Sequence, residues 1–156
     1  MVYIEAMQIS LEKKLGVLNK LLELTEDQAE LLKKDELDDV AFTGIVDKKA
    51  VLIEELTKLD EGFEKMYENI KEEMKADPAA HKEQILALQE LIGKVTEVGV
   101  KLEATERRNK EKVDLFLKTS RNRIKTFNKS NSAVSQYYKN ASAAVTGESF
   151  FMDKKK

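Results

Sequence analysis

The sequence predicts an all-α protein: an elongated antiparallel helical bundle or coiled coil of three long helices with a weakly structured or short-helical C-terminal segment. Charged residues make up 36% of the 156 residues, above the roughly 25% typical of globular domains, yet hydrophobic residues still make up 42%. This combination is typical of long helices that bury one apolar stripe and expose the rest of their surface. A single Pro and scattered β-branched residues argue against a sheet.

The first helix is predicted over residues 3–33, because apolar residues recur there at spacings of three, four and seven. These residues are Ile4, Leu11, Leu15, Leu18, Leu22, Ala29 and Leu32. Leu21, Leu24 and Leu31 widen the stripe beyond a single line. We therefore expect this helix to contact more than one neighbour.

The second helix is predicted over residues 36–76. Asp35 is the expected N-cap, since its carboxylate can accept hydrogen bonds from the free amides of the first turn. Thr43-Gly44 is a weak point in the helix. Beyond it, apolar residues alternate at spacings of three and four, which is typical of a surface that stays in contact with a partner helix. They are Leu52, Leu56, Leu59, Phe63, Met66, Ile70 and Met74.

The third helix is predicted over residues 79–128, after the boundary at Asp77-Pro78. Asp is suited to cap this helix and Pro to occupy its first turn. Its length of about 50 residues corresponds to roughly 75 Å, more than either partner. Its far end must therefore overhang, bend or pair with another element. The short connections at Lys34-Asp35 and Asp77-Pro78 predict antiparallel neighbours.

Glu106 and Asn109 occupy positions where the apolar spacing of the third helix predicts hydrophobic residues. A single Asn in a coiled-coil interface often fixes the register of the helices at some cost in stability. We interpret the two residues in this structural way. A functional bend or a binding groove at residues 106–109 is the alternative.

The C-terminal residues 130–156 have a different composition, with many small and polar residues. The apolar spacing of the third helix stops after Phe127. A few large side chains are set into this region, namely Val134, Tyr137, Tyr138, Val145, Phe150, Phe151 and Met152. Such a segment often becomes ordered only on a partner. We therefore predict two regions, a helical bundle over residues 1–129 and a partner-binding tail over residues 130–156.

The two halves of the chain carry opposite net charges. Residues 1–78 hold 11 Lys/Arg and 20 Asp/Glu, a net charge of −9, whereas residues 79–156 hold 16 and 9, a net charge of +7. The simplest interpretation is that an acidic helical hairpin packs beside a basic helix. Binding of an acidic partner such as nucleic acid is the alternative. No nucleic-acid-binding motif accompanies the charge, so we expect no nucleic-acid partner.

The sequence offers no equipment for catalysis, cofactor binding or metal binding. It has no Cys and one His, His81, which we expect on the surface. A single His rules out the usual histidine-based metal sites and leaves no credible base for a Ser nucleophile. The glycines are dispersed and form no phosphate-binding loop. We therefore expect no enzyme, no cofactor and no metal site.

No stretch approaches the roughly 20 apolar residues of a membrane-spanning helix. The first residues lack the basic start and apolar run of a signal peptide. We therefore expect a cytoplasmic protein.

Several stretches resemble the flagellar export chaperone family FlgN. They include residues 21–40 (LLELTEDQAELLKKDELDDV) and residues 47–56 (DKKAVLIEEL). Arg108-Asn109 in the third helix is similar to the same family. The end of the chain, Tyr137-Tyr138 and residues 150–156 (FFMDKKK), is similar to members from Gram-positive bacteria. The likeness spans nearly the whole chain.

The resemblance implies a cytosolic chaperone for the two hook–filament junction proteins, also called hook-associated proteins. It would bind their C-terminal helical part, prevent premature assembly and deliver them to the membrane-embedded export gate. A client helix would bury its apolar face in a groove. The residues expected to bind the partner are Val134, Tyr137, Tyr138, Phe150 and Phe151 in the tail and Phe116, Ile124 and Phe127 on the third helix. Tyr137 or Tyr138 is the expected contact with the gate.

Two other functions remain open at this point. One is a structural coiled-coil protein that associates with itself, and the possibility of a homo-oligomer stays with it. The other is an export chaperone for a different flagellar or secretion client, such as a filament or cap protein. All such clients offer amphipathic helices, so the sequence does not separate them. For Phe116, Ile124 and Phe127, packing in the core is as well supported as a place in a groove.

Overall fold

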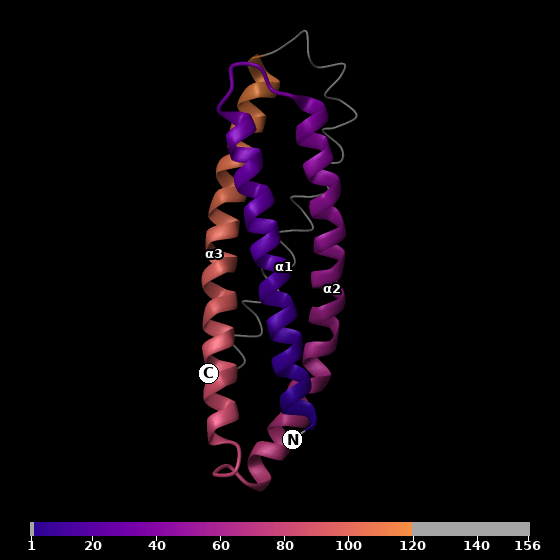
Figure 1. Ribbon diagram of the computed structural model, residues 1–156, viewed down its shortest axis with the longest axis vertical. Helices are drawn as coiled ribbons and strands as arrows, with labels where there is room; N and C mark the ends of the chain where they lie inside the picture. The colour runs from indigo at the N-terminus through magenta and orange to yellow at the C-terminus, as the bar shows by residue number, and fades with distance from the viewer. Residues whose placement is uncertain (1, 120–156) are drawn as a thin grey trace.

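The computed structural model describes residues 2–119 and consists there of three long α-helices (Figure 1). Helix α1 spans Val2–Leu32, α2 spans Asp39–Ala76 and α3 spans Lys82–Thr119. Short connections reverse the chain twice, so α2 runs antiparallel to α1 and α3 runs parallel to it. The predicted fold class, an elongated all-α antiparallel bundle, is confirmed.

Helix α1 is the central element of the described region, because both α2 and α3 pack against it. Helices α2 and α3 make no backbone approach to each other within residues 2–119. The widened apolar stripe of α1 explains this arrangement. Leu15 and Leu22 flank one side of its buried line and Val17 and Leu31 the other, and all four are half-buried against the core. The prediction that this helix contacts more than one neighbour is confirmed.

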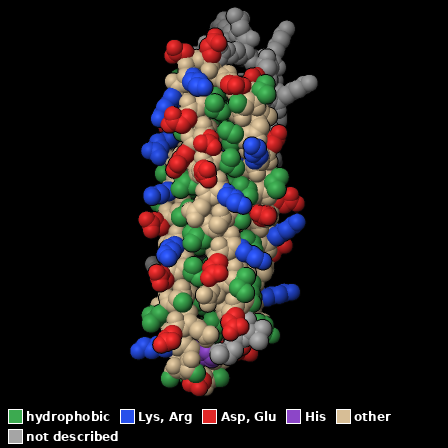
Figure 2. Space-filling model, viewed as in Figure 1, with side chains coloured by type: hydrophobic (Ala, Val, Ile, Leu, Met, Phe, Trp, Pro, Cys, Tyr) green, Lys and Arg blue, Asp and Glu red, His purple; other side chains and the backbone are tan. Residues whose placement is uncertain are grey.

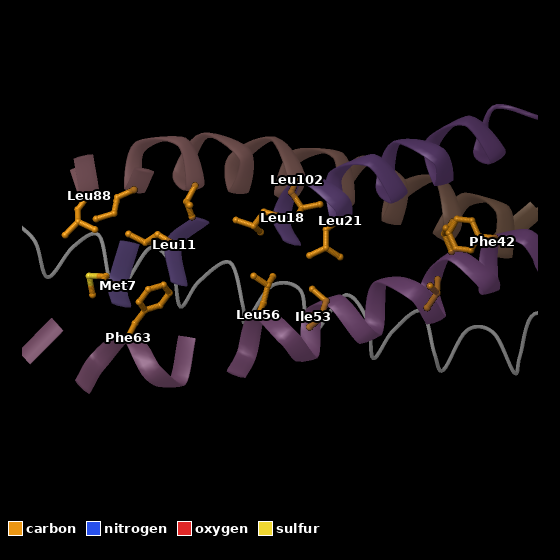
Figure 3. Close-up of a cluster of buried hydrophobic side chains, with 14 of the residues drawn as sticks. Met7, Leu11, Leu18, Leu21, Phe42, Ile53, Leu56, Phe63, Leu88 and Leu102 are labelled. Atoms are coloured by element: carbon orange, nitrogen blue, oxygen red, sulfur yellow. The ribbon is translucent and has the colours of Figure 1, made fainter. Parts of the chain in front are cut away.

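The core is a continuous column of aliphatic and aromatic side chains from all three helices (Figure 3). Leu11, Leu18 and Leu21 of α1 meet Ile53, Leu56 and Phe63 of α2 and Leu88 and Leu102 of α3. Removing a buried side chain of this size to Ala costs about 2–5 kcal/mol. The face of the bundle seen in Figure 2 mixes acidic and basic side chains with scattered apolar ones, as expected for thin helices with one buried stripe.

Helix α2 begins later than predicted, and a different residue caps it. The N-cap is Asp38, whose Oδ1 accepts a hydrogen bond of 3.1 Å from the backbone amide of Ala41. Asp35 lies in the preceding turn, so its prediction as the cap was wrong. The run 35–39 offers several acids that could fill the same role. Buried Leu37 ties the turn to the core, and α2 therefore begins at Asp39. The helix passes Gly44 without interruption.

The connection between α2 and α3 also differs from the prediction. Asp77 closes α2, its amide donating to the carbonyl of Glu73 at 3.4 Å, while its Oδ1 accepts from the amide of Ala80 at 3.4 Å. Pro78 therefore lies in a turn and not in the first turn of α3, which begins at Lys82. From there α3 is continuous through residues 106–109, where a bend was considered. Residues 120–128, the end of the predicted helix, lie outside the described region.

Candidate functional site

A cluster of polar side chains lies in the part of the bundle nearer the α1–α2 turn and joins all three helices. It consists of Thr25 and Gln28 on α1, Lys49 on α2, and Glu106 and Asn109 on α3, and we call these five residues the polar cluster. Each of the five is less than 9% exposed. Each lies on the buried line of its helix, and together they replace one apolar layer of the core by hydrogen-bonding groups.

Lys49 and Glu106 are the charged members of the polar cluster. The Lys49 ammonium donates to a carboxylate oxygen of Glu106 and to the Gln28 side-chain carbonyl, the latter at 2.5 Å. The two side chains are only 0% and 8% exposed. They belong to α2 and α3, the two helices whose backbones do not come close to each other. The ion pair therefore spans the centre of the bundle.

The neutral members of the polar cluster add hydrogen bonds between α1 and α3. The Thr25 hydroxyl lies 2.8 Å from Glu106 Oε1 and 2.6 Å from the Leu21 carbonyl, and its single hydrogen is shared between these acceptors. The Asn109 amide donates to the Thr25 carbonyl at 2.9 Å. Both contacts fix α3 against α1 at one height. Glu106 and Asn109 were predicted as register-setting polar residues, and these contacts are of the kind that sets register.

Burial changes the acid–base behaviour of Lys49. Loss of hydration disfavours the charged ammonium and lowers the pKa of Lys49 from its ordinary 10.5 to about 8, although the Glu106 carboxylate partly opposes this shift. Desolvation is therefore the dominant cause. The ion pair does not fully compensate for the water that Lys49 has lost.

A second buried lysine lies about three turns of α1 away from the polar cluster. The Lys14 ammonium is bound to Asp60 of α2, and it lies 5.4 Å from the centre of the Phe63 ring in a cation–π contact. Lys14 is 1% exposed, but the Asp60 side chain is 23% exposed. Burial raises the pKa of Asp60, with the charge of Lys14 opposing the shift. We call these two residues the Lys14–Asp60 pair.

The predicted partner-binding residues fall largely outside the described region. Phe116 is half-buried and packs against the core near the end of α3. The other seven lie outside residues 2–119: Ile124, Phe127, Val134, Tyr137, Tyr138, Phe150 and Phe151. They remain predictions. The prediction for His81 was wrong: this residue is 8% exposed, because it lies in the turn where α3 folds onto the bundle, and its Nδ1 lies 3.2 Å from Gln84 Oε1.

Sequence reasoning missed the two buried lysines, although a signal was present. Lys14 lies between Leu11 and Leu18 at spacings of three and four, and Lys49 lies in the same way between Val46 and Ile53. Their positions alone therefore place them on the buried line. Their partners, Asp60 and Glu106, are set by the relative heights of different helices, which no local pattern specifies.

Within residues 2–119 there is no group of three or more His, Cys, Asp or Glu side chains placed to hold a metal ion. No helix in that part of the chain is long and apolar enough to cross a membrane. The fold and the polar cluster thus define a helical bundle in which the buried Lys14 and Lys49 form ion pairs between helices.

The chain belongs to the FlgN protein family, whose family model matches residues 1–146. The predicted family is therefore confirmed over nearly the whole chain. FlgN proteins are flagellar export chaperones, and the family is one of chaperones and not of enzymes. No curated protein and no solved structure matches the chain.

Proposed function

We propose that this protein is a cytosolic flagellar type III export chaperone for hook-associated proteins. It binds their C-terminal helical region, prevents premature assembly and delivers them to the export gate. The observation that carries the proposal is the family match over residues 1–146. The bundle adds a physical basis, since chaperone action of this kind needs a long surface for a client helix and no catalytic group.

The side of the bundle where α2 and α3 border one another without close backbone approach is the proposed docking surface, and we call it the α2–α3 face. A client helix placed there would gain a neighbour on each side, as helices in a bundle do. Phe116 and the adjoining Leu117 lie near the end of α3 that meets the α1–α2 turn, and both are half-buried against the core. Phe116, Ile124 and Phe127 are therefore proposed to line one end of the client site.

The C-terminal tail is proposed to close over the bound client. Val134, Tyr137, Tyr138, Phe150 and Phe151 supply large side chains in a part of the chain that is otherwise small and polar. Aromatic residues of this kind carry much of the energy of protein interfaces. Tyr137 or Tyr138 is also proposed as the contact with the export gate.

The test is a binding titration with the C-terminal helical segment of a hook-associated protein from the same organism. The full chain, a truncation to residues 1–129 and a Tyr137→Ala/Tyr138→Ala variant are compared. We expect the double variant to bind client or gate at least about tenfold more weakly, a change of roughly 1.4 kcal/mol, and the truncation to bind client more weakly still. Tyr3→Ala is the matched control, because Tyr3 is an exposed tyrosine on α1.

Three results would count against the proposal in different ways. If the double variant binds both the client and the cytosolic part of the gate as tightly as the wild-type chain does, the two tyrosines are not part of the site. No binding by the folded full chain, together with self-association in sedimentation, would favour a structural coiled-coil protein. Binding of a filament or cap protein in place of the hook-associated segment would change the client and keep the chaperone.

A further inference from the structure

The arrangement of α1, α2 and α3 is that of three corners of a four-helix bundle. In such a bundle each helix packs against two neighbours and faces the fourth across the centre. Helix α1 has two neighbours, whereas α2 and α3 each pack against α1 and make no close backbone approach to each other within residues 2–119. They are therefore diagonal partners, and the Lys49–Glu106 ion pair is the contact across the centre. The fourth corner is the α2–α3 face.

The flanks of the buried lines show what kind of element suits that corner. On α2, Leu52 and Met66 lie on one side of the buried line and are half-buried, while Ala50 and Thr57 lie on the other side and are exposed. Helix α3 has the same asymmetry: Leu91 and Val98 are half-buried on one side of the line, and Gln89 and Glu103 are exposed on the other. An occupant of the fourth corner therefore needs only a narrow apolar stripe between polar flanks.

The 37 residues that follow Thr119 match the corner in length and in starting point. As a helix they would span roughly 55 Å, close to the roughly 57 Å of the 38-residue α2. Helix α3 ends at the same end of the bundle as the turn between α1 and α2 (Figure 1). A chain that reverses after Thr119 thus has the whole length of the α2–α3 face available.

Charge also favours this segment as the occupant. Residues 2–119 hold 19 Lys/Arg and 27 Asp/Glu, a net charge of −8, whereas residues 120–156 hold 8 Lys/Arg and 2 Asp/Glu, a net charge of +6. The two parts attract each other at neutral pH. Neither a second copy of the acidic bundle nor an acidic partner would gain this attraction.

The sequence of the segment has the narrow stripe that the corner requires. The spacing of three and four that was predicted to stop after Phe127 continues through smaller and polar residues. Its members are Ile124, Phe127, Asn131, Val134, Tyr138, Ala141 and Val145. Only one of the seven, Asn131, is polar.

The polar members of the segment also match the height of the polar cluster. Glu106 and Asn109 lie 13 and 10 residues before Thr119. A helix that runs back along the bundle returns to the same height after the same number of residues. With a few residues added for the turn, this places residues 130–136 (SNSAVSQ) level with the polar cluster. Small polar side chains can lie over a buried ion pair and accept or donate hydrogen bonds there, whereas a large apolar side chain would have to desolvate it further.

We propose that in the free protein residues 120–156 bind along the α2–α3 face as its fourth element, with residues 130–136 over the polar cluster, and that a client helix competes with them for this face. The competition rests on the proposed function, whereas the intramolecular docking does not. Because the stripe is narrow and holds small residues, the segment buries less apolar area than α2 or α3 and is displaceable. On displacement its aromatic residues become available to the client.

The test uses electron–electron distance measurements between pairs of spin labels, for which the absence of native Cys is an advantage. One pair is Ala50→Cys with Ala133→Cys, which joins the exposed flank of α2 beside Lys49 to the segment. The control pair is Glu23→Cys with Ala133→Cys, since Glu23 is exposed on α1 and its spacing from Thr25 turns it away from the α2–α3 face. Circular dichroism verifies that both variants fold.

Docking predicts a narrow distribution for the Ala50 pair that is shorter than that of the Glu23 pair by at least about 10 Å, one interhelical spacing. Broad distributions of equal mean for the two pairs would overturn docking. Competition predicts that a saturating hook-associated C-terminal segment lengthens the Ala50 distance. If the segment binds and the distance stays short, competition is wrong. If the hook-associated segment does not bind at all, both the competition and the proposed function are wrong. The distances measured in the free protein still test whether residues 120–156 dock on the α2–α3 face.

Discussion

Two buried lysines of the same bundle are held in different ways. Lys14 is bound to Asp60 on the neighbouring helix, and the carboxylate keeps 23% of its side-chain surface exposed. Lys49 is bound to Glu106 on the diagonal helix, and the two side chains are 0% and 8% exposed. The first pair lies at an edge that water reaches, whereas the second lies in the centre and is completed by Gln28.

The difference shows that the place of the partner, and not the burial of the lysine, decides what a buried charge contributes. The Lys14–Asp60 pair links two helices that already pack through many apolar contacts. The polar cluster links α2 to α3, whose backbones do not come close to each other, and ties α1 to both. A buried ion pair often adds little net stability compared with apolar residues, but removal of one partner is costly. We therefore expect the polar cluster to specify the arrangement of the helices more than to stabilise it.

The largest effect is expected from Glu106→Ala. This variant removes the carboxylate from the Lys49 ammonium in the dry centre of the bundle. Loss of one partner of a buried ion pair typically costs about 3–5 kcal/mol. Chemical denaturation followed by circular dichroism at pH 7 measures the free energy of unfolding. A loss below about 1 kcal/mol would show that water or another group replaces Glu106 readily.

The matched control for Glu106→Ala is the double variant Lys49→Met/Glu106→Leu. It removes both charges and restores apolar volume, so most of the lost stability should return. Its helices should, however, be less strictly arranged. The distance distribution between labels on α2 and α3 is then expected to broaden relative to the wild-type chain, and an unchanged distribution would show that the apolar layers alone fix the arrangement.

The same comparison separates what could be predicted from the sequence from what could not. The three helices, their order and the apolar positions such as Leu56 and Leu102 follow from spacing alone, because the apolar spacing along each helix indicates which of its residues are buried. Glu106 and Asn109 stood out for the same reason. Their partners did not, since the heights at which Lys49 and Thr25 meet them depend on two turns whose exact lengths the sequence leaves open.

Those turns show why the boundaries of the helices were harder to predict. Asp35 and Asp38 are both good caps, and only the burial of Leu37 between them decides where α2 begins. His81 was expected in water because it follows Pro78, but its place under the start of α3 is a consequence of the turn. The proposed partner-binding residues beyond Thr119 are a different case, for they stay predictions from composition and family resemblance.

A smaller and asymmetric effect is expected at the Lys14–Asp60 pair. Asp60→Ala leaves the Lys14 ammonium against the Phe63 ring without this carboxylate, and we expect a loss of about 1–3 kcal/mol. Lys14→Met keeps the aliphatic stem in place, and Asp60 can turn toward the water that already reaches it, so the loss should stay below about 1 kcal/mol. Denaturation midpoints of both variants test the order. Equal losses, or the reverse order, would mean that Asp60 is as enclosed as Glu106.

The pH dependence of stability provides the finest distinction between the two pairs. Because the pKa of Lys49 falls from 10.5 to about 8 on folding, the unfolded chain holds a proton between these pH values that the folded chain has released. The free energy of unfolding should therefore rise with pH in this window, by at most about 1.4 kcal/mol per unit from this group. Lys49→Met should lack this rise, so the stability of the wild-type chain relative to the variant grows from pH 8 to pH 10.

Asp60 should act in the opposite direction and at the acidic end. Its pKa is raised above the ordinary 3.8 on folding, so the folded chain keeps a proton that the unfolded chain has lost. Its contribution is fully present below pH 3.8 and is lost as the pH rises through the folded pKa. Comparison of the wild-type chain with Asp60→Asn from pH 3 to pH 6 isolates this contribution. Should the difference between these two proteins stay constant over that range, the carboxylate would be in contact with water as freely in the folded chain as in the unfolded one.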